Sequence, residues 1–254
     1  MRVFKILLAL LVFVLVVAGI LAWTLPADVG YRYGTRYLGP VALTGISGTV
    51  WNGHADGVSV FGHDIGELDW HASKGPLLHG QFVADVRIKG AGVDVAGELA
   101  RSAGMISARD LRFSMPAALL APVLDIGTLK LLGTISGVVN QATLANAMLR
   151  DASGNARWSD AGVAGQAEAR FSDILAEFAS QPDGSVAGTL RDDGQGTLAV
   201  DGTFKVRFAT TDAQARLSAR NGDAQITEAL RYIGEPQPDG STKLVVHGQI
   251  LKVL

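Results

Sequence analysis

An apolar run near the N-terminus constrains this chain more than any other feature. From Ile6 to Trp23, 18 successive residues carry neither a charge nor a hydroxyl group. A helix rises about 1.5 Å per residue, so this run would be roughly 27 Å long, close to the hydrocarbon thickness of a bilayer. Pro26 then ends the helix. The run therefore predicts a transmembrane helix over residues 6–25.

The charges beside the run predict its orientation. Arg2 and Lys5 precede it, whereas Asp28 follows it. Positive charge stays on the cytoplasmic side, so residues 1–5 should be cytoplasmic and the bulk of the chain should cross. A cleavable signal peptide is the alternative, but its apolar region spans about 7–15 residues and ends at a small-x-small site, which Ala22-Trp23-Thr24 does not provide. In either case the bulk of the chain faces an extracytoplasmic space.

Residues 26–40 form a juxtamembrane segment with an unusual content of tyrosine. Tyr31, Tyr33 and Tyr37 are three of the 4 tyrosines of the chain, and arginines alternate with them. Such a segment can lie along the lipid headgroups, where aromatic and basic residues are enriched. It can equally be a short helix packed on the first strands.

Residues 41–254 show the two-residue period of β-strands. In Gly66–Ser73 and Gln81–Lys89, apolar and polar residues alternate, as in strands with one buried face. Asn-Gly and Asp-Gly pairs, which suit two-residue hairpins, recur between such stretches. We therefore expect a mainly β protein, a large antiparallel meander of about twelve to fourteen strands. The pairs are Asn52-Gly53, Asp56-Gly57, Asp183-Gly184, Asp193-Gly194, Asp201-Gly202, Asn221-Gly222 and Asp239-Gly240.

One or two short helices and a weak repeat complete the expected β domain. Pro116–Leu124 and Asp223–Ile233 have helical patterns. Two short motifs recur in the same order and at nearly the same spacing, which favours two similar β sub-units, 41–125 and 126–254. Chance is the alternative in a chain with 31 glycines. The matches are Ile46-Ser47-Gly48 with Ile135-Ser136-Gly137, and Gly66–Trp70 with Gly154–Trp158.

Composition and motifs disfavour several classes of function. The formal net charge is −2, whereas a nucleic-acid-binding protein normally has a basic surplus, so we expect no nucleic acid partner. There is no cysteine, hence no disulfide or thiolate metal site, and no phosphate loop, nucleophile elbow or zinc-protease motif occurs. His54, His63, His71 and His79 are better explained as solvated side chains than as metal ligands. We therefore expect no catalytic residues, no cofactor and no metal.

Several stretches of the chain together resemble a known family. They are Leu25-Pro26-Ala27 after the apolar run, Val41–Gly53 (VALTGISGTVWNG), Leu68-Asp69-Trp70, Pro76–Gly80 (PLLHG) and Leu230–Ile250 (LRYIGEPQPDGSTKLVVHGQI). In this order they resemble the type II secretion system protein N family, over almost the whole chain. The least distinctive part is 140–220.

The resemblance implies a non-enzymatic component of the apparatus that exports folded proteins from the periplasm across the outer membrane. It implies a single-pass protein of the bacterial inner membrane, with its N-terminus in the cytoplasm and its bulk in the periplasm. Its implied partners are the inner-membrane platform proteins and the outer-membrane secretin. The family offers no catalytic residues, and its motif positions have structural roles, with Trp51 and Trp70 as core anchors. These positions are Gly48, Trp51, Gly53, Trp70, Gly234, Asp239 and Gly240.

Two other classes of protein compete with this interpretation. An N-terminal anchor followed by antiparallel strands also resembles envelope proteins of the AsmA type, which offer a long apolar groove to lipid, although those chains are usually far longer. An enzyme is the third alternative.

The closing run Lys243–Ile250 is apolar and free of proline, so it is a candidate edge strand for a partner. Val245, Val246 and Gln249 are the residues that we expect at this edge. The alternative is that this strand is paired on both sides.

Overall fold

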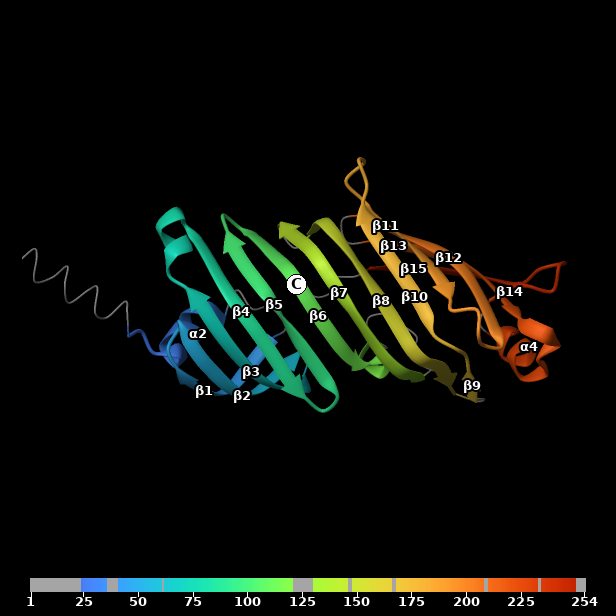
Figure 1. Cartoon of the computed structure of the whole chain (residues 1–254), viewed down its shortest axis with the longest axis horizontal. Helices are drawn as coiled ribbons and strands as arrows, with labels where there is room; N and C mark the ends of the chain where they lie inside the picture. The colour runs from blue at the N-terminus through green and yellow to red at the C-terminus, as the bar shows by residue number, and fades with distance from the viewer. Residues whose placement is uncertain are drawn as a thin grey trace, which may run out of the picture.

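The computed structural model describes residues 24–35, 41–60, 62–120, 130–145, 148–165, 168–207, 210–232 and 234–249. These residues form one antiparallel sheet of 15 strands (Figure 1). Each strand from β1 to β8 lies beside its neighbour in sequence, and β10 to β13 continue in the same way. At the C-terminal end β15 lies between β13 and β14, and the short β9 pairs with β8 alone. The expected antiparallel meander is confirmed.

The strands have the following bounds. The first eight are β1 (Val41–Gly48), β2 (Asn52–Val60), β3 (His63–Ser73), β4 (Gln81–Gly90), β5 (Val93–Ser102), β6 (Met105–Pro116), β7 (Lys130–Ala145) and β8 (Met148–Ala164). The others are β9 (Glu168–Arg170), β10 (Ile174–Ser180), β11 (Val186–Asp192), β12 (Leu198–Arg207), β13 (Thr210–Ala219), β14 (Glu235–Pro236) and β15 (Thr242–Gln249).

Short helices lie at the ends of strands. They are α2 (Ala27–Gly34), α4 (Ala224–Leu230) and the 3₁₀ turns η2 (Gly75–His79), η3 (Ala117–Leu120) and η4 (Arg220–Gly222). Helix α4 confirms the expected second helix, and its cap is Asp223, whose carboxylate accepts from the Ile226 N–H at 2.9 Å. Turn η3 confirms part of the first expected helix, Pro116–Leu124. Residues 6–23 of the expected transmembrane helix lie outside the described residues, among which no helix is long and apolar enough to cross a membrane.

Helix α2 packs on the first strands, as one interpretation of the juxtamembrane segment expected. The Tyr31 hydroxyl accepts a hydrogen bond from the Leu43 N–H of β1 at 3.0 Å. Pro26 forms an isolated antiparallel bridge with Thr49, and the Val50 N–H donates to the Leu25 carbonyl at 3.0 Å. These contacts attach the segment before and within α2 to the first strand and the turn that follows it.

Asp-Gly pairs close hairpins at some of the expected places and not at others. Asp183-Gly184, Asp193-Gly194 and Asp239-Gly240 lie in connections between strands, as predicted. Asn52-Gly53, Asp56-Gly57 and Asp201-Gly202 lie inside β2 and β12, so those turn predictions are wrong. The first hairpin already reverses at Thr49, whose N–H donates to the Asn52 carbonyl, and the second pair occupies a register shift in β2.

The strand registers place one unbroken row of apolar residues across the sheet. Cα partners link thirteen strands, and every residue in this apolar row is aliphatic, aromatic or glycine. The row is Ile46, Ala55, Leu68, Ile88, Val95, Phe113, Gly137, Ala156, Ala176, Leu190, Gly202, Ala215 and Leu244. Since β6 pairs with β7, the two expected sub-units share this one sheet.

A second apolar row lies two residues along each strand, on the same face. Gly97 meets Leu111 in it across a register shift between β5 and β6. The row is Gly48, Gly53, Trp70, Val86, Gly97, Leu111, Val139, Gly154, Phe178, Gly188, Phe204, Ala213 and Val246.

The opposite face carries a largely polar row, because side chains alternate along a strand. Its apolar exceptions are Ala96, Val138 and Val245. The polar row is Ser47, His54, Asp69, Arg87, Ala96, Arg112, Val138, Asn155, Glu177, Thr189, Thr203, Gln214 and Val245.

Aromatic rings on the apolar face lie over glycines of the neighbouring strand. A Cβ atom built on Gly154 would lie 2.8 Å from the Phe178 ring, and one on Gly137 would lie 3.0 Å from the Phe113 ring. A Cβ on Gly53 would overlap the Trp70 indole. Gly53 therefore leaves room for the Trp70 ring, whereas a Cβ on Gly137 or Gly154 would also overlap a backbone carbonyl of the adjacent strand.

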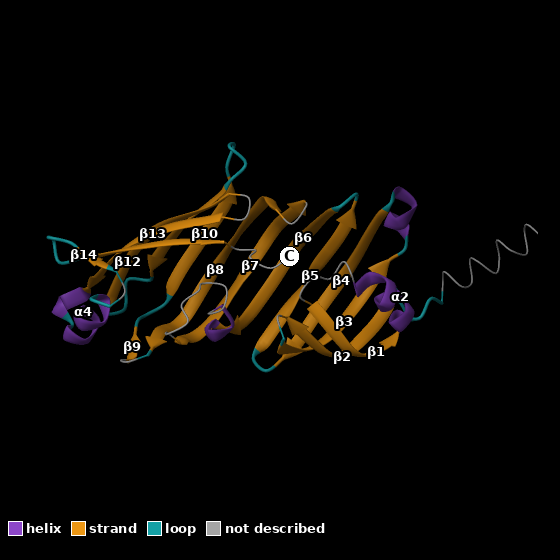
Figure 2. Ribbon diagram, turned by 180° about the vertical axis from the view of Figure 1, so that it is seen from behind, coloured by secondary structure: helices purple, strands orange, loops and turns teal. Residues whose placement is uncertain are grey.

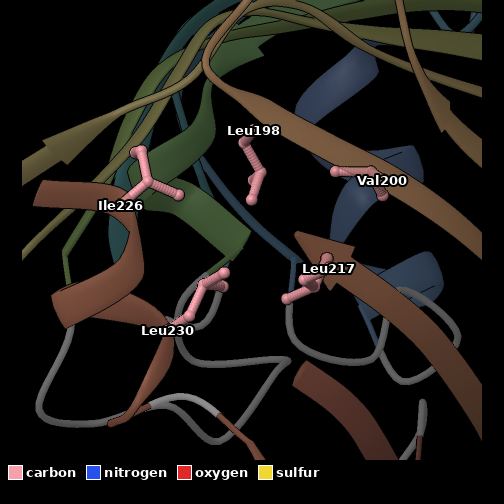
Figure 3. Packing of buried hydrophobic residues seen from close by; sticks show 5 residues of the cluster. All are labelled: Leu198, Val200, Leu217, Ile226 and Leu230. Atoms are coloured by element: carbon pink, nitrogen blue, oxygen red, sulfur yellow. The ribbon is translucent and has the colours of Figure 1, made fainter. Parts of the chain in front are cut away.

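A small core closes the C-terminal end of the sheet. Ile226 and Leu230, one helical turn apart on α4, are 3% and 4% exposed. They pack on Leu198, Val200 and Leu217 of β12 and β13 (Figure 3). Helices α2 and α4 lie at opposite ends of the sheet (Figure 2). Among the described residues, no aromatic side chain is fully buried.

The first prediction concerns Gly53, the glycine that lies under the Trp70 ring. Gly53→Ala should lower the free energy of unfolding by about 1–3 kcal/mol, because the added methyl overlaps the Trp70 ring. The matched control Gly75→Ala, with no heavy atom within 4 Å of its Cβ position, should change it by at most about 0.5 kcal/mol. Urea unfolding of the detergent-solubilised full chain, followed by indole fluorescence, measures both. Equal effects would contradict a steric role for Gly53.

The second prediction concerns two Asp-Gly-Ser turns. A hydrogen bond from Lys205 and then those from Ser185 lower the pKa of Asp183, and hydrogen bonds from Ser241 lower the pKa of Asp239. A folded-state pKa below the unfolded value of about 3.9 gives stability that is present above that pH and is lost as pH falls through the folded pKa. The urea midpoint should therefore fall more on acidification in the wild type than in the Asp183→Asn, Asp239→Asn double variant. Parallel pH curves would refute the assignment.

Candidate partner-binding surface

The polar face is hollowed between β7 and β15. The hollow has a volume of about 1370 Å³, and its lining includes two complete rows of polar-face positions from β8 to β15. One row ends at Val245 and the other at His247, both on β15. Six successive members of the polar row line it: Asn155, Glu177, Thr189, Thr203, Gln214 and Val245. The hollow therefore reaches from the middle of the sheet to its last long strand.

Charged side chains around the hollow are paired with one another. Arg191 contacts Glu177 at 2.7 Å, Lys205 contacts Asp183 at 2.7 Å, and His247 contacts Asp212 at 2.7 Å. All three pairs are well exposed, so each contributes little to stability. Arg191 and Lys205 nevertheless each have a carboxylate as a near neighbour.

The histidines on the first hairpins have local partners. His54 lies between two carboxylates, with Nδ1 2.8 Å from Asp69 and Nε2 3.3 Å from Asp56. The hydrogen bond with Asp69 raises the pKa of His54. His71 is hydrogen-bonded to Asn52, its partner in the β2–β3 register. Within the described parts of the chain, no three histidine or acidic side chains form a group that could hold a metal ion.

Strand β15 is paired unequally on its two sides. On one side β13 pairs with it from Thr242 to Gln249. On the other side, among the described residues, β14 pairs only with Thr242 and Lys243. Within the part of the chain that the structure describes, this second side is therefore an open edge from Leu244 onward.

The alternating direction of the backbone groups shows which residues of β15 point their N–H and C=O groups to that edge. The Ser241 carbonyl points toward the β14 side, since it accepts from the Gln237 N–H at 2.8 Å. In an antiparallel strand the N–H and C=O of one residue point to the same side, and successive residues alternate. Val245 and Gln249 therefore direct their backbone groups to the open edge. Val246 directs its groups to β13, so it belongs to the existing ladder.

Strand β1, at the opposite end of the sheet, has a partly occupied edge. The Leu43 N–H on that strand is satisfied by the Tyr31 hydroxyl of α2. A side chain thus takes the place of a neighbouring strand at this position. Tyr31 was not singled out for this role from the sequence, because a side-chain to backbone bond across the chain has no local signal.

The first group of motif residues gathers at the β1–β2 hairpin. Gly48 pairs with Gly53, and Gly53 pairs with Trp70. The Trp70 indole N–H donates to the Val50 carbonyl at 3.1 Å, and the Lys74 ammonium lies 5.4 Å from the centre of the Trp51 ring. Both indoles are half-buried. Trp70 thus bonds to the β1–β2 turn, and Trp51 contacts Lys74, the residue before η2, at the same end of the sheet.

The second group of motif residues forms the β14–β15 hairpin at the opposite end. A Cβ atom on Gly234 would overlap the Lys243 carbonyl, and Gly240 has a φ of +80°. The Asp239 carboxylate accepts from the Ser241 N–H at 3.0 Å and from its hydroxyl at 2.6 Å. The structure does not bring the two groups of motif residues together.

Comparison with known proteins identifies the sheet by sequence. The model of the family described as "Type II secretion system (T2SS), protein N" matches residues 39–245, from just before β1 into β15. A similar protein is the "Type II secretion system protein N" of Vibrio cholerae serotype O1 (strain ATCC 39315 / El Tor Inaba N16961). It is 29% identical over 205 residues, which cover 78% of this chain and 80% of that protein. No solved structure matches this chain.

Proposed function

The chain belongs to the type II secretion system protein N family, and from this premise we propose that it is a non-enzymatic, membrane-anchored scaffold of the secretion apparatus. The anchor is the apolar run Ile6–Trp23 in the inner membrane. The sheet lies in the periplasm, as the positions of Arg2 and Lys5 favour. Its partners are other secretion components, namely the inner-membrane platform proteins and the outer-membrane secretin.

The open edge of β15 is the observation that carries the proposed mode of contact. Beyond Lys243 its outward backbone groups have no strand beside them among the described residues. A strand from a partner can add there, with backbone hydrogen bonds supplying affinity. The exposed Val245 and His247 side chains then supply selectivity, because they also line the hollow on the polar face.

The proposed topology gives the third prediction. A reporter that is active only in the periplasm, fused after Leu254, should be active, and the mature protein should keep its N-terminus. N-terminal sequencing of the membrane-bound protein checks the second point. A mature chain that began at Thr24 or later would reveal a cleaved signal peptide instead.

The fourth prediction separates the two sides of β15. Val245→Pro removes an N–H that points to the open edge, so the protein should fold but lose capture of its partner. Val246→Pro removes an N–H from the ladder with β13 and should lower the thermal midpoint strongly. The measurement is co-purification of co-expressed secretin and platform proteins with the tagged full chain from mildly solubilised membranes.

The comparison with Val245→Thr supplies the control for the side chain. This variant keeps the backbone N–H, so it should capture partners nearly as well as the wild type. A folded Val245→Pro protein that captured the secretin and platform proteins as well as Val245→Thr does would refute strand addition at this edge.

A further inference from the structure

The apolar rows form a continuous strip without polar chemistry. Neither row contains a charged residue, and the one side-chain hydrogen-bonding group in them, the Trp70 indole N–H, is already donated to the Val50 carbonyl. The side chains of the strip are therefore apolar throughout, from β1 to β15.

Most of the strip between its ends is only half-buried. Val86, Ile88 and Val95, on β4 and β5, retain part of their surface in contact with solvent. Helix α4 covers the strip at the C-terminal end, where Ile226 and Leu230 are packed. The segment carrying α2 is attached to the β1–β2 turn at the other end.

The dimensions of the strip follow from the geometry of the sheet. Neighbouring strands are about 4.8 Å apart, so thirteen strands span roughly 58 Å. Two rows of side chains are about 14 Å wide. The strip is therefore long and narrow, and helix α4 covers part of it at the C-terminal end.

The smooth surface of the strip and its lack of hydrogen-bonding groups favour a flexible hydrocarbon chain over a protein as the bound partner. The Trp70 and Phe178 rings lie over glycines of the next strand, so they do not stand out as anchors. A protein interface carries about one hydrogen bond per 100–200 Å², together with protruding aromatic anchors, and these rows offer neither. Acyl chains require no hydrogen bonds and can follow a smooth strip.

The start of the strip is bonded to the residues that directly follow the apolar run of the sequence. Leu25 and Pro26, directly after the apolar run, are bonded to the β1–β2 turn at Val50 and Thr49. The strip begins at this turn, with Ile46 and Gly48. We propose that the strip binds acyl chains of phospholipid drawn from the membrane that holds the N-terminal run. The source of the lipid rests on the proposed anchorage, whereas the binding surface does not.

Two adjacent valines allow a matched test. Val139 belongs to the second apolar row and Val138 to the polar row, so the same side chain faces opposite sides of β7. Each is replaced separately by the photoreactive p-benzoylphenylalanine in the full chain, in cells grown with ³²P-phosphate. After illumination, the protein is purified under denaturing conditions and its covalent label is measured. A third probe, at Leu15 in the apolar run, tests the anchorage by itself.

The expected result is ³²P on the Val139 probe and only background on the Val138 probe, with the label lost on treatment with phospholipase C. Absence of label at Val139, equal label at both positions, or label that resists phospholipase C would overturn the proposal. Crosslinking of Val139 to a second copy of this chain or to another protein would also overturn it, by assigning the strip to a protein interface. Label at Leu15 without label at Val139 would retain the anchor and reject lipid binding by the sheet, whereas the reverse would reject the anchor alone.

Discussion

Strand-to-strand registration of apolar side chains is the interaction on which the rest of the structure depends. In a strand the side chains alternate between faces, so a slip of one residue would move a whole apolar set to the opposite face. Thirteen strands avoid this, including those where the ladder is irregular. Between β5 and β6 one extra residue is inserted, yet Ala108 and Phe113, on either side of it, both remain on the apolar face. The irregularities therefore preserve the division of the sheet into two faces.

The local sequence pattern was sufficient to predict much of the fold. It was insufficient where the identity of a residue depends on a contact with a residue far away in the chain. The alternation in Gly66–Ser73 and Gln81–Lys89 correctly predicted strands, and Asp223 with the apolar positions after it correctly predicted a helix. Asn52-Gly53 and Asp201-Gly202 were wrongly predicted as turns. Gly53 leaves room for the ring of Trp70, a residue seventeen positions away in the chain, and no local turn rule contains that requirement.

The candidate surface was predictable only in part, for a similar reason. Apolar composition identified the last strand as a potential edge, but the side on which it is open depends on where β14 pairs. That pairing also assigns Val245 and Val246 to different sides. The hollow on the polar face arises from the mutual placement of β7 to β15, so single stretches of sequence contain no sign of it. The proposed contact and the proposed lipid strip consequently use different surfaces, an edge and a face, which can be occupied together.

The sequential order of the strands has a consequence for how the chain acquires its structure. Nearly every strand pairs with the strand synthesised just before it, so most pairings join segments that follow one another in the sequence. Hairpins can therefore form in order as the polypeptide emerges, each new strand covering the growing end left by the last. The exceptions are β9, which pairs with β8 alone so that β10 also follows β8, and the final step, in which β14 precedes β15 in the chain but lies outside it. Among the described residues, the outer side of β15 is thus unpaired beyond Lys243, and a strand from another chain can add there in the same way as each strand of the sheet adds to its neighbour.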